Sequence, residues 1–219
     1  MFDFDAVTDR TGTDSVKYDF AESYGKEKGL LPMWVADMDF QTAPEIVEAL
    51  TRRVRHGIFG YTESKEGYFQ AVQGWYASHF QWRVQKDWLV KTPGVVFALA
   101  MAVRAFTKEG EGVLIQQPVY YPFGRVITEN GRRLVNNPLK LQGGHYEIDF
   151  EDFERKIADE KVKLFLLCSP HNPVGRVWKE WELRRMGELC KKYGVLVVSD
   201  EIHSDFVWQD HQHRVFVSL

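Results

Sequence analysis

The chain has 219 residues, and 28 Lys and Arg against 31 Asp and Glu give it a formal net charge of −3. Hydrophobic residues make up 44% and charged residues 27%, an ordinary globular composition that excludes a disordered, collagen-like or simple coiled-coil chain. A weakly acidic chain without basic blocks is not expected to bind nucleic acid. No apolar run approaches the ~20 residues that span a bilayer, so we expect no membrane segment.

The predicted elements alternate along the chain after an irregular, polar start. Apolar residues that recur on one face predict helices at 44–55, 66–80, 95–106, 122–129, 150–158 and 179–193. Short apolar runs predict strands at 113–115, 134–135, 164–168 and 195–198. Continuous apolar strands separated by helices are typical of an α/β fold, with a mostly parallel sheet and helices on both faces. Ligands of such folds bind beyond the carboxyl ends of the strands.

The two cysteines, Cys168 and Cys190, are too few for a disulfide scaffold. Both lie in or beside apolar segments, which predicts buried free thiols. Free thiols persist in a reducing compartment. The acidic start at 1–5 does not resemble a signal peptide, so we expect a cytoplasmic protein.

Polar residues follow two of the predicted strands. Ser-Pro-His-Asn-Pro-Val-Gly occupies 169–175, and Ser-Asp-Glu-Ile-His occupies 199–203. One predicted helix separates Asn172 from Asp200, so a right-handed crossover would bring both to the same edge of the sheet. Taken singly, a turn residue before proline and a helix cap remain the alternatives for these two positions.

These two segments resemble the pyridoxal-phosphate enzymes of the class I and II aminotransferase family, fold type I. The His three residues after the Asp, together with Trp-Val-Ala-Asp-Met-Asp-Phe at 34–40, resembles the cystathionine β-lyase, or C–S lyase, branch. Phe-Gly-Tyr at 59–61 and Pro-Val-Tyr-Tyr at 118–121 also match the family. The resemblance implies the N-terminal part of a longer protein, truncated before its C-terminal domain. Residues 1–42 would then belong to a small domain, and 43–219 to an incomplete large cofactor-binding domain.

The resemblance implies pyridoxal 5′-phosphate as the cofactor and assigns residues to its ring. Asp200 would keep the pyridine nitrogen protonated, because a buried carboxylate favours the charged form of a cationic neighbour. Asn172 would donate to the ring's 3-oxygen, with His203 near the same oxygen, and Tyr120 would stack on the ring. A structural histidine and a core tyrosine are the alternatives for the last two.

The phosphate of such a cofactor needs backbone N–H donors at the start of a helix. The start of the helix at 95–106 provides them at Gly94, Val95 and Val96, although Pro-Gly before a helix is more often a plain turn. By resemblance, Tyr61 would reach the phosphate of a partner subunit in a homodimer. Asp37 and Met38 would lie near a small amino-acid substrate.

The family's Schiff-base lysine has no counterpart here. The last lysine, Lys192, precedes Asp200 and is expected at the solvated end of a helix, as is Lys191. The arginines that follow the lysine in the family are missing too. We therefore assign no catalytic residue in this chain and expect it to be inactive alone.

Three functions are compatible with these residues. The leading one is the N-terminal portion of a C–S β-lyase that converts an amino-acid thioether to a thiol, pyruvate and ammonia. An aminotransferase would use the same residues. A non-catalytic cofactor-binding or regulatory chain is the third, because the lysine is absent.

Two other kinds of site are not favoured. His203, Asp205, Asp210, His211 and His213 cluster near the end, but His-Gln-His spacing does not match a zinc-binding helix. A solvated polar loop without a metal is predicted there. No Gly-x-Gly-x-x-Gly follows a predicted strand, which argues against a dinucleotide fold.

Overall fold

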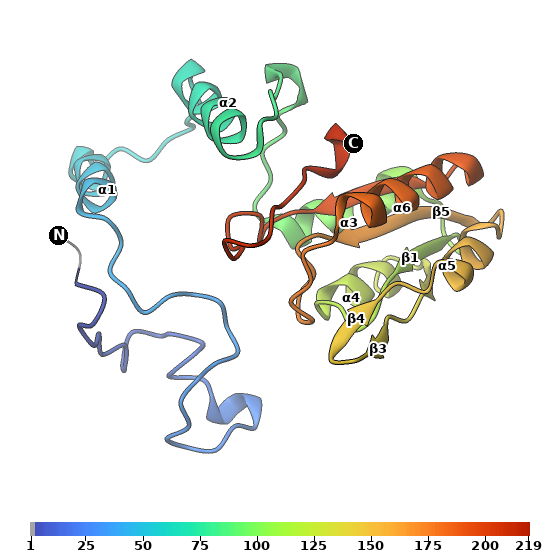
Figure 1. The fold of residues 1–219 in the computed structure, drawn as a ribbon. Helices are drawn as coiled ribbons and strands as arrows, with labels where there is room; N and C mark the ends of the chain where they lie inside the picture. The colour runs from blue at the N-terminus through green and yellow to red at the C-terminus, as the bar shows by residue number, and fades with distance from the viewer. Residues whose placement is uncertain (1–2) are drawn as a thin grey trace. The chain divides into compact units, whose positions relative to one another are not determined.

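The structure, a computed structural model, describes residues 3–219. The chain, drawn in Figure 1, divides into two compact units, with the division in sequence between Glu63 and Ser64. The first two residues of the predicted acidic start, Met1 and Phe2, lie outside the described residues. The assignment of 1–42 and 43–219 to two domains of a longer protein stays a prediction.

Among its described residues, 3–63, the first unit is mostly irregular and contains one α-helix, α1 (Pro44–His56), besides the short 3-10 helix η1 (Glu22–Tyr24). Proline suits the first turn of α1, where its missing N–H has no acceptor to lose. The helix ends at His56 and is followed by Gly57, whose φ of 72° is strained for other residues. The predicted helix at 44–55 is confirmed.

The second unit is built around a parallel sheet. Its elements are α2 (Glu66–Phe80), η2 (Lys86–Trp88), α3 (Val95–Phe106), β1 (Gly112–Ile115), α4 (Pro122–Thr128), β2 (Arg133–Asn136), β3 (Lys140–Gln142), β4 (His145–Glu147), α5 (Phe150–Ile157), β5 (Val162–Cys168), α6 (Glu180–Tyr193), β6 (Leu196–Asp200) and η3 (Phe216–Ser218). Four strands pair in the order β2-β1-β5-β6, all parallel. Within the described residues, β6 has a neighbouring strand on one side only.

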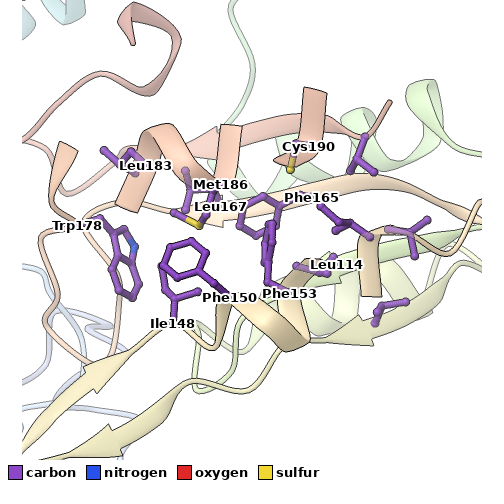
Figure 2. Packing of buried hydrophobic residues seen from close by; sticks show 14 of the residues in the cluster. Leu114, Ile148, Phe150, Phe153, Phe165, Leu167, Trp178, Leu183, Met186 and Cys190 are labelled. Carbon is purple, nitrogen blue, oxygen red and sulfur yellow. The ribbon is translucent and has the colours of Figure 1, made fainter. Parts of the chain in front are cut away.

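Helices cover both faces of this sheet. On one face, α5 and α6 pack against Phe165 and Leu167 of β5, as Figure 2 shows. On the other, α3 and α4 pack against Leu164 and Leu166. Successive residues of a strand point to opposite faces, so a continuous apolar run is what a strand buried on both faces requires. The predicted α/β architecture is confirmed.

The antiparallel hairpin of β3 and β4 was not predicted. Its strands have three residues each and are largely exposed, so they carry no apolar run. The turn is Gly143-Gly144, and both glycines have positive φ, 54° and 82°. The dipeptide was the only local signal for this hairpin.

Both cysteines are buried and free, as predicted. Burial raises the pKa of Cys168 and that of Cys190 to about 12, so both thiols stay protonated. Among the described residues, no helix combines the length and hydropathy needed to cross a bilayer.

Candidate active site

The carboxyl ends of β5 and β6 lie side by side at one edge of the sheet. Cys168, the last residue of β5, is in register with Asp200, the last residue of β6. The N–H of Ser169 donates to the Asp200 carbonyl over 2.9 Å. The segment that leads to Asn172 therefore begins beside Asp200, and the predicted meeting of the two loops at this edge is confirmed.

The loop that follows β1 joins the same edge. The backbone N–H of Tyr120 donates to the carbonyl of Asn172 over 2.8 Å. The ring of Tyr120 lies 5.2 Å from that of Tyr121 and is partly exposed. Burial, followed by the charges of Tyr121 and Asp200, raises the pKa of the Tyr120 hydroxyl. An aromatic face is thus available beside the strand ends.

The carboxylate of Asp200 is buried and forms no ion pair with any of the described residues. The residue is 8% exposed, and burial raises the pKa of its carboxyl group. Its Oδ1 accepts a hydrogen bond of 3.1 Å from the N–H of Ile202. The alternative of a helix cap is wrong, because the residues that follow form a turn instead of a helix. A buried carboxylate in this state would be stabilised by any bound cation.

Asn172 and His203, the two residues predicted to lie near the 3-oxygen of the cofactor, follow the same strand ends. Asn172 is half-buried, and its N–H donates to the Sγ of Cys168 over 3.4 Å. Within the described residues, both hydrogen bonds of Asn172 are made by its own backbone N–H and carbonyl. Its side-chain amide is therefore available to bind a ligand. His203 is half-buried with its ring edge-on to Phe206 at 6.4 Å, and its charge acts to lower the pKa of Asp200.

The start of α3 offers unpaired backbone donors. Gly94 has a φ of 125°, a conformation that side chains rarely adopt, and no side chain caps the helix. The first intrahelical bond runs from the N–H of Ala98 to the Gly94 carbonyl, so the N–H groups before Ala98, those of Val95 and Val96 among them, have no acceptor within the helix. Val95 and Asp200 both line a mainly apolar cavity of about 800 Å³. The helix start and the buried carboxylate therefore face one space.

In the first unit, Asp37 belongs to an ionic cluster that the sequence analysis missed. Arg10 pairs with Asp37 over 2.6 Å and with Asp39 over 2.8 Å, and Asp39 also accepts from Lys17 and from the Tyr18 hydroxyl, each over 3.0 Å. Arg10, and next Lys17, lowers the pKa of Asp39 to about 2. Because Arg10 and Lys17 lie more than 20 residues before Asp39, no short sequence motif indicates this cluster.

Met38 and Tyr61 are both exposed in the first unit, Tyr61 fully. The substrate role of Asp37 and Met38 and the role of Tyr61 in a partner subunit stay predictions.

The histidines near residue 210 differ from the predicted solvated loop at one position. Asp210 and His211 are exposed and paired over 3.0 Å, but His213 is buried, with its Nε2 3.0 Å from Glu201. Glu201 also accepts from Ser199 and from the N–H of Phe216, so it anchors the segment after β6. Across residues 3–219, no three His, Cys, Asp or Glu residues are grouped so as to hold a metal ion.

Lys191 and Lys192 are exposed at the end of α6, as predicted, and Lys192 pairs with Glu154 over 2.7 Å. Lys191 lines the same cavity as Asp200, whereas Lys192 does not.

Comparison with known proteins shows to which family the chain belongs. The family model described as aminotransferase class I and II matches residues 30–218. The chain is similar to cystathionine beta-lyase PatB of Bacillus subtilis, with 49% identity over 99% of this chain and 56% of that protein. It is also similar to protein MalY of Escherichia coli, with 38% identity over 97% of this chain and 55% of that protein.

Among solved structures, cystalysin from Treponema denticola, which contains a pyridoxal 5′-phosphate cofactor, matches with a TM-score of 0.94 and 40% identity. The match covers 100% of this chain and 56% of that one. The chain spans about half the length of the curated relatives it matches. The parallel sheet, its strand-end residues and these matches agree: the chain belongs to the class I and II aminotransferase family.

Proposed function

We propose that this chain holds pyridoxal 5′-phosphate and forms the cofactor-binding part of a C–S β-lyase. The observation that carries the proposal is the buried carboxylate of Asp200, which has no ion-pair partner among the described residues and lines the same cavity as the start of α3. A protonated pyridine nitrogen would supply the cation that this carboxylate lacks. The relatives named as cystathionine β-lyases support the reaction type.

The residues present fit this cofactor in charge and in kind. The N–H groups of Gly94, Val95 and Val96, for which the described residues provide no acceptor, suit a phosphate, since the positive end of the helix dipole also favours an anion. The amide of Asn172 can donate to a phenolic oxygen, and the ring of Tyr120 can cover one face of a flat heterocycle.

When bound, pyridoxal phosphate supplies an electron sink for the Cα of an amino acid. The chain's own part is to hold the proton at the pyridine nitrogen through Asp200 and to orient the ring through Asn172 and Tyr120. We propose no catalytic residue here, since the last lysine, Lys192, is exposed and paired with Glu154. The proposed substrate is a small amino-acid thioether, cleaved to a thiol, pyruvate and ammonia.

An aminotransferase is the second candidate, and the description of the matching family model favours it. A non-catalytic cofactor-binding chain is the third. The full-length protein with cystathionine separates them. Pyruvate released without an added keto acid supports the lyase, and a strict requirement for a keto acid overturns it in favour of transamination. Cofactor binding with neither reaction leaves the third.

We also propose a homodimer and a cytoplasmic location. In α1, Ile46, Val47, Leu50 and Val54 are 49–63% exposed, although their spacing places them on one face. A continuous apolar face of this kind is typical of an interface. The two buried thiols support a reducing compartment. Light scattering should give twice the protomer mass, and Leu50→Asp should return a monomer.

A further inference from the structure

Two hydrogen bonds join the loop after β1 to the loop after β5. One is the backbone bond from the N–H of Tyr120 to the carbonyl of Asn172, at 2.8 Å. The other uses a side chain: the Nε2 of His171 lies 2.9 Å from the carbonyl oxygen of Pro118. Pro118, two residues before Tyr120, and His171, one residue before Asn172, therefore form a second connection between the same loops.

The imidazole of His171 is buried beside residues that are themselves held by hydrogen bonds. The residue is 2% exposed, and its ring stands edge-on to the ring of Trp178, at 5.4 Å and 86°. Its backbone N–H donates to the Arg176 carbonyl over 2.7 Å, and its carbonyl accepts from Gly175 over 2.9 Å. Trp178 is itself fixed, because its Nε1 donates to the Cys168 carbonyl over 2.9 Å. The His171 ring therefore lies between Trp178, which is bonded to the end of β5, and the carbonyl of Pro118.

The chemistry of the contact determines which nitrogen carries the proton. A carbonyl oxygen only accepts, so the hydrogen must be on Nε2. Nδ1 is buried and has no partner among the described residues, so it stays unprotonated. Burial lowers the pKa of His171 to about 4, which keeps the neutral donor in place at neutral pH.

We propose that His171 is a positioning residue. Its hydrogen bond to Pro118 holds the loop that carries Tyr120 against the loop that carries Asn172, and so sets the aromatic face and the amide that orient the cofactor. The inference rests on the proposed function for its consequence, but the contact itself exists without a cofactor. Both halves can therefore be tested separately.

Three substitutions separate the hydrogen bond from packing. His171→Gln keeps an amide N–H near the position of Nε2, and His171→Leu removes the donor at similar volume. His171→Asn also carries an amide, but its side chain is too short for that amide to reach the Pro118 carbonyl. His145→Leu, on exposed β4, makes the same chemical change away from these loops. Should the leucine variant fail to fold, the pair of amide variants decides the question.

The first readout is amide hydrogen exchange of Tyr120 without cofactor, compared with the core amide of Phe165. We expect His171→Leu and His171→Asn to speed exchange at Tyr120 roughly three- to tenfold, the effect of one lost hydrogen bond, with little change at Phe165. His171→Gln should restore most of the protection. Wild-type exchange in all variants, or equal loss in the glutamine variant, would overturn the role.

The second readout is the affinity for pyridoxamine 5′-phosphate, measured by its own fluorescence. This compound lacks the aldehyde, so it does not react with surface lysines. We expect the donor-less variants to bind it roughly three- to tenfold more weakly and His171→Gln to bind it nearly as the wild type does. Altered exchange with unaltered affinity would overturn the link to the cofactor. If the wild type itself does not bind, the proposed function fails, while the exchange data still decide the contact.

Discussion

Replacing Arg176 by methionine would leave a buried carboxylate without its charge partner. Two hydrogen bonds of 2.8 and 2.9 Å join the Arg176 guanidinium to Glu182, and their side chains are 16% and 6% exposed. Methionine keeps an unbranched apolar stem but loses the guanidinium, which lies 4.5 Å from the centre of the Trp178 ring and donates to the Tyr146 carbonyl. After the change, Glu182 retains one hydrogen bond, of 2.7 Å, from the N–H of Lys179.

The size of the effect follows from this geometry. Removing one partner of a buried ion pair typically costs about 3–5 kcal/mol in unfolding free energy. Because the N–H of Lys179 still stabilises the carboxylate, we expect Arg176→Met to cost about 3 kcal/mol, at the lower end of that range. The double variant Arg176→Met/Glu182→Gln removes the buried charge and keeps an oxygen for that N–H. It should cost about 1–2 kcal/mol, less than the single variant.

Urea unfolding followed by far-UV circular dichroism gives both free energies, provided that the slope with denaturant is unchanged. A cost below about 1 kcal/mol for Arg176→Met would show that the pair is not effectively buried. A double variant less stable than the single one would contradict the assignment of the loss to the stranded carboxylate.

Three further results are expected. Cys168 and Cys190, with pKa values raised to about 12 by burial, should resist a thiol reagent at pH 8 until urea unfolds the chain, and fast native labelling would contradict their burial. Because Arg10 lowers the pKa of Asp39 from 3.8 to about 2, the stabilisation by this carboxylate is complete above pH 3.8 and is lost as the pH falls towards 2. The protection factors of the amides around residue 39, which correct for the intrinsic pH dependence of exchange, should fall over that window. Asp39→Asn should show low protection factors already at pH 6, and a flat profile would refute the ionic cluster. Phe153→Ala should cost about 3–5 kcal/mol in urea unfolding, because the ring is fully buried, and a loss under about 1 kcal/mol would be inconsistent with that packing.

The regular part of the fold could be predicted because it depends on local patterns. The run Leu164–Cys168 is apolar at every position, which a strand buried on both faces requires, and one helix separates it from the next such run. That topology brings Asn172 and Asp200 to one edge of the sheet. The predicted cofactor roles of these residues stay proposals, since they depend on a ligand.

What could not be predicted depends on residues that meet only through space. Arg10 and Asp39 are far apart in sequence, and each alone is an ordinary surface residue. His213 belongs to a polar stretch, yet its contact with Glu201 buries it. The bond from His171 to Pro118 crosses between two loops whose proximity follows only from the pairing of β1 with β5. No period or motif in the sequence encodes these contacts.

The most direct test of the cofactor site is the binding of pyridoxamine 5′-phosphate to the chain and to Asp200→Asn. Asparagine keeps the oxygen that accepts from Ile202 but loses the charge. The exposed carboxylate of Asp210 provides a matched control, Asp210→Asn. We predict saturable binding by the wild type and by the control. Asp200→Asn should bind roughly 10- to 100-fold more weakly, the effect of losing one charge-assisted hydrogen bond. Equal affinities in all three chains, or no saturable binding by the wild type, would contradict the account.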